Sequence, residues 1–272
     1  MLVIKTDYLT DDMYDALTDL VLDVNEADGA KYAVPDDADY YAIAYEDGSS
    51  TVTVPEDVDA EKLDPDMMRS VIAIYEMGET HEGMTVIELS AFTGPVFRQR
   101  GWFRTLFESI REELSAFAIR FAVYENDINK KVLKCINAVH EHDELMMALT
   151  EDAVKKAAAL SENMDIEAGI ESERVDTEEG SFDEGRVETP YGECFFRVYG
   201  ENAYVYGILT YDSFLRKGRA YAMLLKLFKY FDDINVSEVT LEVSASNVPA
   251  VRLYEKLGFT VVDRLSYYYV VK

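Results

Sequence analysis

The chain has 272 residues, of which 49% are apolar and 12% aromatic, so it can bury a sizeable core in one large domain or two ordinary ones. Its formal net charge of −27 argues against a nucleic-acid-binding surface, because contacts to phosphates need clustered Lys and Arg. The same charge suits a cationic partner drawn in by the overall field, or it serves solubility alone, and the second alternative is the simpler one.

No run of about 18 apolar residues occurs, which argues against a membrane span. The first residues lack a basic region and a long apolar stretch, so we expect no export signal. Cys135 and Cys194 are the two cysteines, and they lie far apart without a Cys or His pattern of metal-ligand spacing. We therefore expect neither a disulfide nor a metal framework, and the cytoplasm as the location.

The first half of the chain alternates short apolar runs with helical patterns. Residues 3–6, 40–45 and 70–75 are predicted strands, and a helix is predicted after the first of them. Residues 85–93 form the strongest strand pattern of this half and lead through a turn to Gly101. The helix after this turn has one apolar stripe, made of Phe103, Leu106, Phe107, Ile110 and Leu114.

The second half repeats this order. Residues 195–199 and 203–211 are predicted strands of a hairpin, because Gly200 and Asn202 mark a turn between them. The chain then passes through Gly218 into another helix. Its apolar face consists of Ala220, Met223, Leu224, Leu227, Phe228 and Phe231.

Gly101 and Gly218 align the two halves at an offset of 117 residues. In each half a further strand and helix come next, and in the first half this helix is expected at residues 130–138. Such self-similarity predicts two copies of one strand–turn–helix–strand–helix unit. We place the boundary between the copies at residues 155–162, with a helix at residues 153–160 as the bridge.

The turn Arg216-Lys217-Gly218-Arg219-Ala220 opens straight into the helix of the second half. Unpaired backbone N–H groups at such a helix start bind a pyrophosphate, helped by the helix dipole. Gly218 lets a ligand approach the backbone, and the small Ala220 keeps the first turn open. Taken alone, the turn fits a phosphate site or an ordinary strand-to-helix connection.

A second pattern occurs at residues 241–259. It consists of a strand, then Asn247 in the next loop, then the run Leu253-Tyr254-Glu255-Lys256-Leu257-Gly258-Phe259. This order closely resembles the second signature of the GNAT family of N-acetyltransferases, which ends in L-Y-x-x-x-G-F. The family's first signature, Q/R-x-x-G-x-G/A, is matched at Gly218 and Ala220, while Leu215 replaces the leading Gln or Arg. Residues 165–272 thus resemble a GNAT domain.

The resemblance implies an α/β fold in which mixed, mostly antiparallel sheets are flanked by helices. It implies two GNAT-like units in tandem, at residues 1–155 and 162–272, with acetyl-CoA as co-substrate and no metal. In the family, the strand before the turn bulges away from its neighbour and holds the pantetheine arm, a role that falls here on Ile208, Leu209 and Thr210. The remaining implied acetyl-CoA contacts are Arg216, Lys217, Gly218, Arg219, Ala220 and Asn247.

The implied reaction is transfer of an acetyl group to a primary amine of a small molecule or peptide. Tyr254 matches the position from which a phenol protonates the departing CoA thiolate, although a mid-helix tyrosine also fits plain packing. Glu242 is the candidate base that removes the amine proton through water, and an outward-facing strand residue is the alternative. A non-catalytic CoA-binding or scaffolding module also stays open, as does a homodimer.

The first half departs from the family pattern. Arg98 and Gly101 fit R-x-x-G, but Phe103 replaces the small residue, and Lys134 stands where Tyr254 stands in the second half. We expect a degenerate N-terminal copy, and weak CoA binding with the help of Arg98 and Arg100 is the alternative.

Overall fold

The computed structural model describes residues 1–271 apart from 50, 56–61, 163, 165 and 178–179. The chain divides into two compact units. Unit 1 consists of Met1–Glu141 together with Leu265–Lys272, and unit 2 consists of His142–Arg264. No helix in the described part of the chain has both the length and the hydrophobicity that a membrane crossing requires.

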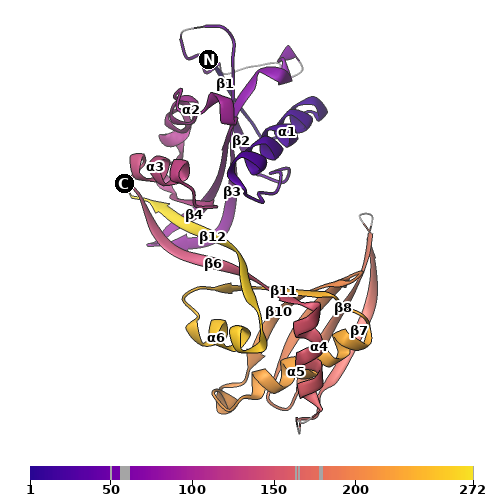
Figure 1. The fold of residues 1–272 in the computed structure, drawn as a ribbon. Helices are drawn as coiled ribbons and strands as arrows, with labels where there is room; N and C mark the ends of the chain where they lie inside the picture. Colours follow the sequence, from indigo (N-terminus) through magenta and orange to yellow (C-terminus); the bar gives the residue numbers. More distant parts are fainter. Residues whose placement is uncertain (50, 56–61, 163, 165, 178–179, 272) are drawn as a thin grey trace. The chain divides into compact units, whose positions relative to one another are not determined.

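Unit 1 is a sheet with helices on both faces (Figure 1). Its strand order is β1-β2-β3-β4-β5-β12, in which β4 and β5 are parallel and the other neighbours antiparallel. One face packs against α1 and the other against α2 and α3. The elements are β1 (Leu2–Thr6), α1 (Asp11–Asp28), β2 (Tyr40–Tyr45), β3 (Met68–His81), β4 (Met84–Thr93), α2 (Trp102–Arg111), β5 (Ala118–Val123), α3 (Asp127–Cys135) and the end of β12 (Thr260–Val270).

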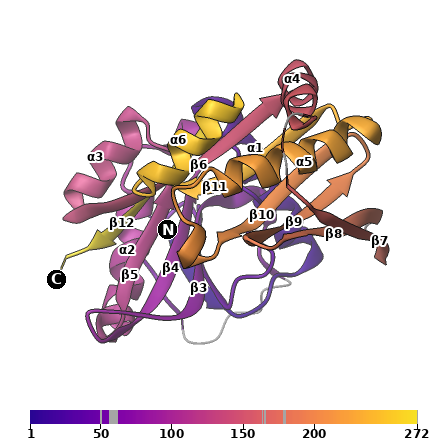
Figure 2. The same cartoon turned by 90° about the horizontal axis from the view of Figure 1, so that it is seen from below.

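Unit 2 has the strand order β7-β8-β9-β10-β11-β6, in which β10 and β11 are the parallel pair. All three of its helices pack into one core on the same face, with α4 and α5 side by side (Figure 2). The elements are β6 (Ala138–Thr150), α4 (Glu151–Ser161), β7 (Gly169–Thr177), β8 (Gly180–Thr189), β9 (Gly192–Tyr199), β10 (Asn202–Thr210), α5 (Arg219–Asp233), β11 (Glu238–Ser244) and α6 (Val248–Leu257).

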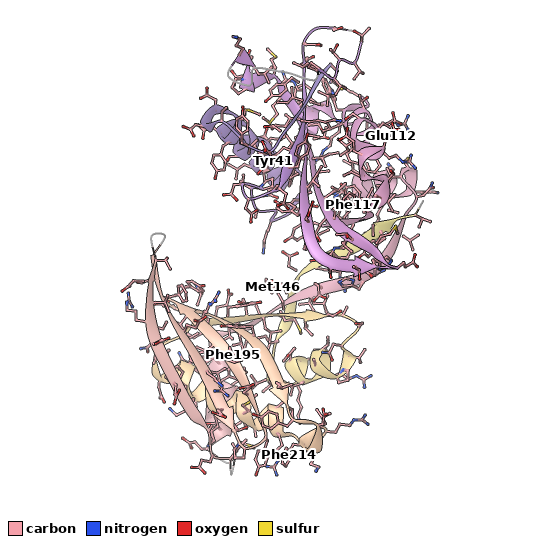
Figure 3. All side chains as sticks on the ribbon, turned by 180° about the vertical axis from the view of Figure 1, so that it is seen from behind. Tyr41, Glu112, Phe117, Met146, Phe195 and Phe214 are labelled. Atoms are coloured by element: carbon pink, nitrogen blue, oxygen red, sulfur yellow. The ribbon has the colours of Figure 1, made fainter. Side chains whose placement is uncertain are left out.

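The other face of the unit 2 sheet carries no helix of this unit among the described residues, and we call it the open face. Its side chains come from strand positions that alternate with the buried ones, as the period of two requires. Figure 3 looks onto this face and labels Phe195 on it. The open-face residues include Glu184, Phe195, Arg197, Tyr204, Tyr206 and Glu242.

Each sheet is completed by a strand from the other predicted copy. In unit 1, Ser266–Tyr269 of β12 pairs with Arg120–Val123 of β5. In unit 2, Glu144–Thr150 of β6 pairs with Glu238–Ser244 of β11. The sequence predicts a boundary at residues 155–162, but the compact units divide between Glu141 and His142, because strand pairing places β6 and α4 with the second half.

The elements expected from periodicity are otherwise confirmed, with exceptions at the ends of α2 and α3. α2 ends at Arg111, so Leu114 of the predicted stripe lies in the following 3-10 helix Glu113–Ala116. The helix predicted at residues 130–138 ends at Cys135, and β6 begins at Ala138. Asn137 between them has a φ of 56°, a left-handed conformation that ends a helix.

Candidate functional site

The parallel strands β10 and β11 pair over only part of their length. Their register runs from Asn202 opposite Glu238 to Tyr204 opposite Thr240, and it stops there. Both strands continue, β10 to Thr210 and β11 to Ser244. The facing edges of Val205–Thr210 and Leu241–Ser244 therefore have backbone groups that no ladder between these strands satisfies, and we call them the unpaired edges.

A β-bulge lies where β10 leaves its partner. On the side of β9, Tyr206 pairs with Phe195 and Leu209 with Glu193, so that Gly207 and Ile208 face the single residue Cys194. Gly207 has a φ of +59°, and a Cβ atom there would come within 2.9 Å of the Phe195 ring. Glycine is required at this position both by the backbone conformation and by the close contact.

Directly after β10 the chain forms the predicted nest. Arg216 and Gly218 both have left-handed φ, at 57° and 72°, and Gly218 is the N-cap of α5. The N–H of Ala222 donates to the Gly218 carbonyl, whereas the N–H groups of residues 219–221 in the first turn of α5 have no acceptor within the helix. A row of free donors at the positive end of a 15-residue helix is suited to an anion.

The cationic side chains of this nest are held against the turn. Lys217 donates from Nζ to the carbonyl of Ser213 at 2.8 Å. The Arg219 guanidinium lies 4.0 Å from the Tyr191 ring centroid, and its buried Nε has no hydrogen-bond partner. Arg216 is exposed. The buried, unsatisfied Nε of Arg219 indicates that a further acceptor belongs here.

Tyr254 of α6 is 6% exposed and packs in the core of unit 2, with its ring 5.9 Å from that of Phe259. Burial, and then the neighbouring Cys194 thiol, raise the pKa of Tyr254 to about 12. Cys194 is the residue that faces the bulge of β10. The phenol of Tyr254 thus lies at the helix-covered side of the bulge.

Glu242 lies in β11, and Asn247 lies at the start of α6. Glu242 is exposed on the open face, and among the described side chains it forms no ion pair. Burial, and then the negative charge of Glu242, raise the pKa of Tyr204. Asn247 is the N-cap of α6, where its Oδ1 accepts from the Ala250 N–H at 3.3 Å. The side-chain oxygen of Asn247 is therefore engaged in the helix cap.

Residues 181–259 match the model of the acetyltransferase (GNAT) family. This segment is a GNAT-family domain. It contains the bulge, the unpaired edges, the nest and α6 with Tyr254.

Two curated relatives are similar to this chain over a short stretch. Over 70 residues the chain is 39% identical to an N-alpha-acetyltransferase of Sulfurisphaera tokodaii, covering 25% of this chain and 42% of that protein. Over 67 residues it is 42% identical to an N-alpha-acetyltransferase of Saccharolobus solfataricus, covering 24% of this chain and 40% of that protein. The matches thus span about two fifths of these relatives' length.

Two solved structures resemble the whole chain in fold. A tandem GNAT protein from the clavulanic acid biosynthesis pathway gives a TM-score of 0.66 at 10% identity, covering 99% of this chain and 98% of that one. A GCN5-related N-acetyltransferase from Sphaerobacter thermophilus gives 0.61 at 14% identity, covering 99% and 96%. The tandem arrangement of GNAT-type folds expected from the repeat is confirmed.

The first GNAT-type copy keeps the turn but not the strand geometry. Gly101 is again the N-cap of a helix, with a φ of 89°. The register of β3 with β4 runs without interruption from Ser70 opposite Thr93 to Glu76 opposite Ile87, so this part of β4 has no bulge. β4 thus lacks the bulge of β10, although it too parts from its parallel neighbour, since its pairing with β5 stops at Leu89 opposite Phe121.

The side chains of the first copy are also engaged differently. Arg98 donates to both carboxylate oxygens of Asp28 in α1, at 2.6 and 2.9 Å. The ring of Phe103 packs against Phe107 and Phe121. Lys134, which aligns with the buried Tyr254, is exposed.

Sequence reasoning missed the bulge glycine and the role of Cys194. Gly207 stands alone within an alternating strand pattern, which is itself a signal for a bulge. The position of Cys194 opposite the bulge depends on the register of β9 with β10, and no local pattern carries that register.

Proposed function

We propose that the GNAT domain transfers an acetyl group from acetyl-CoA to a primary amine. The observation that carries the proposal is continuity: the bulge and unpaired edges of β10 lead directly into the nest at the start of α5. An extended pantetheine arm needs free strand edges, and a pyrophosphate needs free N–H groups at a helix start. This chain has free strand edges in β10 and β11 and, after β10, free N–H groups at the start of α5.

The residues that hold acetyl-CoA are assigned from that order. Backbone groups of Ile208, Leu209 and Thr210 bind the arm as an added strand would. Backbone N–H groups from Arg216 to Ala220 bind the pyrophosphate, and Arg219 has an unused donor for the same anion. Asn247 acts indirectly, because its side chain is occupied in capping α6. Acetyl-CoA itself supplies an acetyl group activated as a thioester.

Two side chains move protons in this proposal. Tyr254 keeps its proton at neutral pH because its pKa is about 12, and it donates that proton to the departing sulfur at the bulge. Glu242, on the open face, takes a proton from the amine through water. Acid and base therefore act from opposite faces of the sheet, with the reacting carbonyl held at the unpaired edges between them.

The acceptor is proposed to be the α-amino group of a peptide. Relatives similar to about a quarter of this chain are named N-alpha-acetyltransferases, which supports the peptide over a small-molecule amine. Both cysteines are free thiols, which supports a reducing cytoplasm as the location.

We propose that the N-terminal unit is a degenerate copy without acetyl-CoA binding. Its β4 register is straight, Phe103 fills the first turn of α2, and the charge of Arg98 is engaged by Asp28. Each of these differences removes a feature with which unit 2 is proposed to bind acetyl-CoA.

One observation favours a second candidate, a CoA-binding module without turnover. Glu242 is exposed and on the face opposite Tyr254, as an ordinary outward strand residue is. Release of free CoA thiol separates the two candidates. We expect release of CoA thiol that requires both acetyl-CoA and a peptide with a free N-terminus. Binding of acetyl-CoA without thiol release in the presence of any amine would support the module.

A further inference from the structure

Three charged or polar side chains form a network across the open face of unit 2. Tyr206 of β10 donates from its hydroxyl to Oε1 of Glu184 in β8 at 2.9 Å. Arg197 of β9 donates from Nε to the same oxygen at 2.8 Å. Three neighbouring strands are thus tied at one carboxylate, in the region that faces the viewer in Figure 3.

The network sets the direction of the Tyr206 side chain. The strand order is β8-β9-β10-β11, so a hydrogen bond from Tyr206 to β8 draws the ring over β9 and away from β11. The ring stacks on Phe195, its cross-strand neighbour, with centroids 5.7 Å apart. The Arg197 guanidinium lies 5.5 Å from the same ring. Tyr206 is therefore held by Glu184, Phe195 and Arg197, and its ring also stacks on that of Tyr204, with centroids 5.8 Å apart.

Charge strengthens this arrangement. Arg197, and then the Tyr206 hydroxyl, hold the pKa of the Glu184 carboxyl below its usual value, so the acceptor oxygen stays ionised at neutral pH. Hydrogen bonds to an ionised carboxylate are stronger than those between neutral groups. Both ring stacking and the cation–π contact add to the preference for one rotamer.

The position of Tyr206 matters because this residue adjoins the bulge. Gly207, the first residue of the bulge, comes next in the chain. With the Tyr206 ring over β9, the open face beside the unpaired edges is left to Tyr204 and Glu242. Released from Glu184, a tyrosine at this position has staggered χ1 alternatives that direct its ring elsewhere, the unpaired edges included.

We propose that Glu184, supported by Arg197, is a positioning residue that keeps Tyr206 clear of the acceptor's approach to the acetyl group. This inference rests on the proposed function. In this inference the amine acceptor binds on the open face, and a displaced Tyr206 ring would block it sterically.

The test compares steady-state acetylation of a peptide N-terminus by the full chain and its variants, together with acetyl-CoA affinity by calorimetry. Glu184→Ala should lower kcat/KM for the peptide roughly tenfold while acetyl-CoA affinity stays within about twofold. The double variant Glu184→Ala with Tyr206→Ala should regain most of that loss, because the ring that blocks the approach is gone. Glu188→Ala is the matched control, since Glu188 is an exposed carboxylate of the same strand that pairs with Arg186, and it should leave kcat/KM unchanged.

Specific outcomes would overturn the inference. They are an unchanged kcat/KM in Glu184→Ala, or a double variant no better than Glu184→Ala, since a merely structural role of Glu184 would not be rescued by deleting Tyr206. If Glu184→Ala fails to fold, Tyr206→Ala alone decides: it should keep the wild-type kcat/KM for the peptide, and a large loss would contradict the inference. Failure of the proposed function is distinguished at the start, because the wild-type chain would then acetylate no amine at all.

Discussion

Gln99 and Arg216 occupy the same place in the two halves of the chain, and both have a left-handed backbone, with φ of 62° and 57°. Two residues later, Gly101 and Gly218 cap their helices with φ of 89° and 72°. The turn is thus repeated in backbone detail. The difference lies in the strand before it, which bulges in β10 and runs straight in β4. We attribute the proposed difference in acetyl-CoA binding to the strands.

The bulge should be sensitive to a single methyl group. Gly207→Ala places a Cβ within 2.9 Å of Phe195 and adds the roughly 1–2 kcal/mol of a left-handed L-residue. We expect a lower melting temperature and a loss of acetyl-CoA affinity by calorimetry. Gly200→Ala is the control, because Gly200 has a φ of +61° with nothing within 4 Å. It should lower stability alone, and equal affinity in both variants would contradict the role of the bulge.

Tyr254→Phe should lower kcat by about 100- to 10,000-fold, the usual contribution of a positioned general acid. Acetyl-CoA affinity should be retained, because the ring and its packing with Phe259 remain. Assays of CoA thiol release measure kcat, and calorimetry measures acetyl-CoA affinity. Tyr230→Phe removes a hydroxyl from another helical tyrosine packed on the same core and should leave kcat unchanged. An unaltered kcat in Tyr254→Phe would leave Tyr254 with packing only.

The pH dependence of kcat is set by the raised pKa of Tyr254. A phenol with a pKa of about 12 in place of 10.0 is protonated, and so competent as an acid, throughout the neutral and moderately alkaline range. We therefore expect no decline of kcat up to about pH 10 from loss of this proton. A decline near pH 9 that disappears in Tyr254→Phe would show that the phenol titrates far lower than its burial implies.

The exchange of strands predicts where a C-terminal truncation acts. Removing residues 265–272 deletes the partner of β5, the Tyr267 ring 5.3 Å from the Arg120 guanidinium, and the Tyr269 ring stacked on His81 at 3.9 Å. Hydrogen exchange should accelerate in β5 by about tenfold or more while β11 stays protected, because β11 keeps β6 as its partner. Faster exchange confined to β11 would mean that the last strand belongs to unit 2.

Local pattern was sufficient for much of this molecule. Strand alternation, helical stripes and the sequence around Gly218 and Tyr254 predicted most elements and the turn at Gly218, because each depends on neighbours in the chain. The unit boundary was out of reach, since the partners of β6 and β12 are residues at least 88 positions away in the chain, as in the pair Thr150 and Glu238. The same holds for the engagement of Arg98 by Asp28.

The open face shows the same limit in the site itself. Glu184, Arg197 and Tyr206 come from three strands, and nothing in their spacing announces that they share one carboxylate oxygen. The sequence identified Glu242 as a carboxylate on a strand. Only the structure shows that Glu242 and Tyr254 lie on opposite faces of the sheet.

Calorimetric titration of acetyl-CoA into the wild-type chain, Gly218→Glu and Gly101→Glu tests the central claim most directly. Both variants place a carboxylate at a left-handed N-cap with open space around it, so they are matched in backbone strain and in charge. We predict one site per chain in the wild type, loss of binding in Gly218→Glu and unchanged binding in Gly101→Glu. Two sites per chain, or binding that survives Gly218→Glu, would contradict the assignment of acetyl-CoA to unit 2 alone.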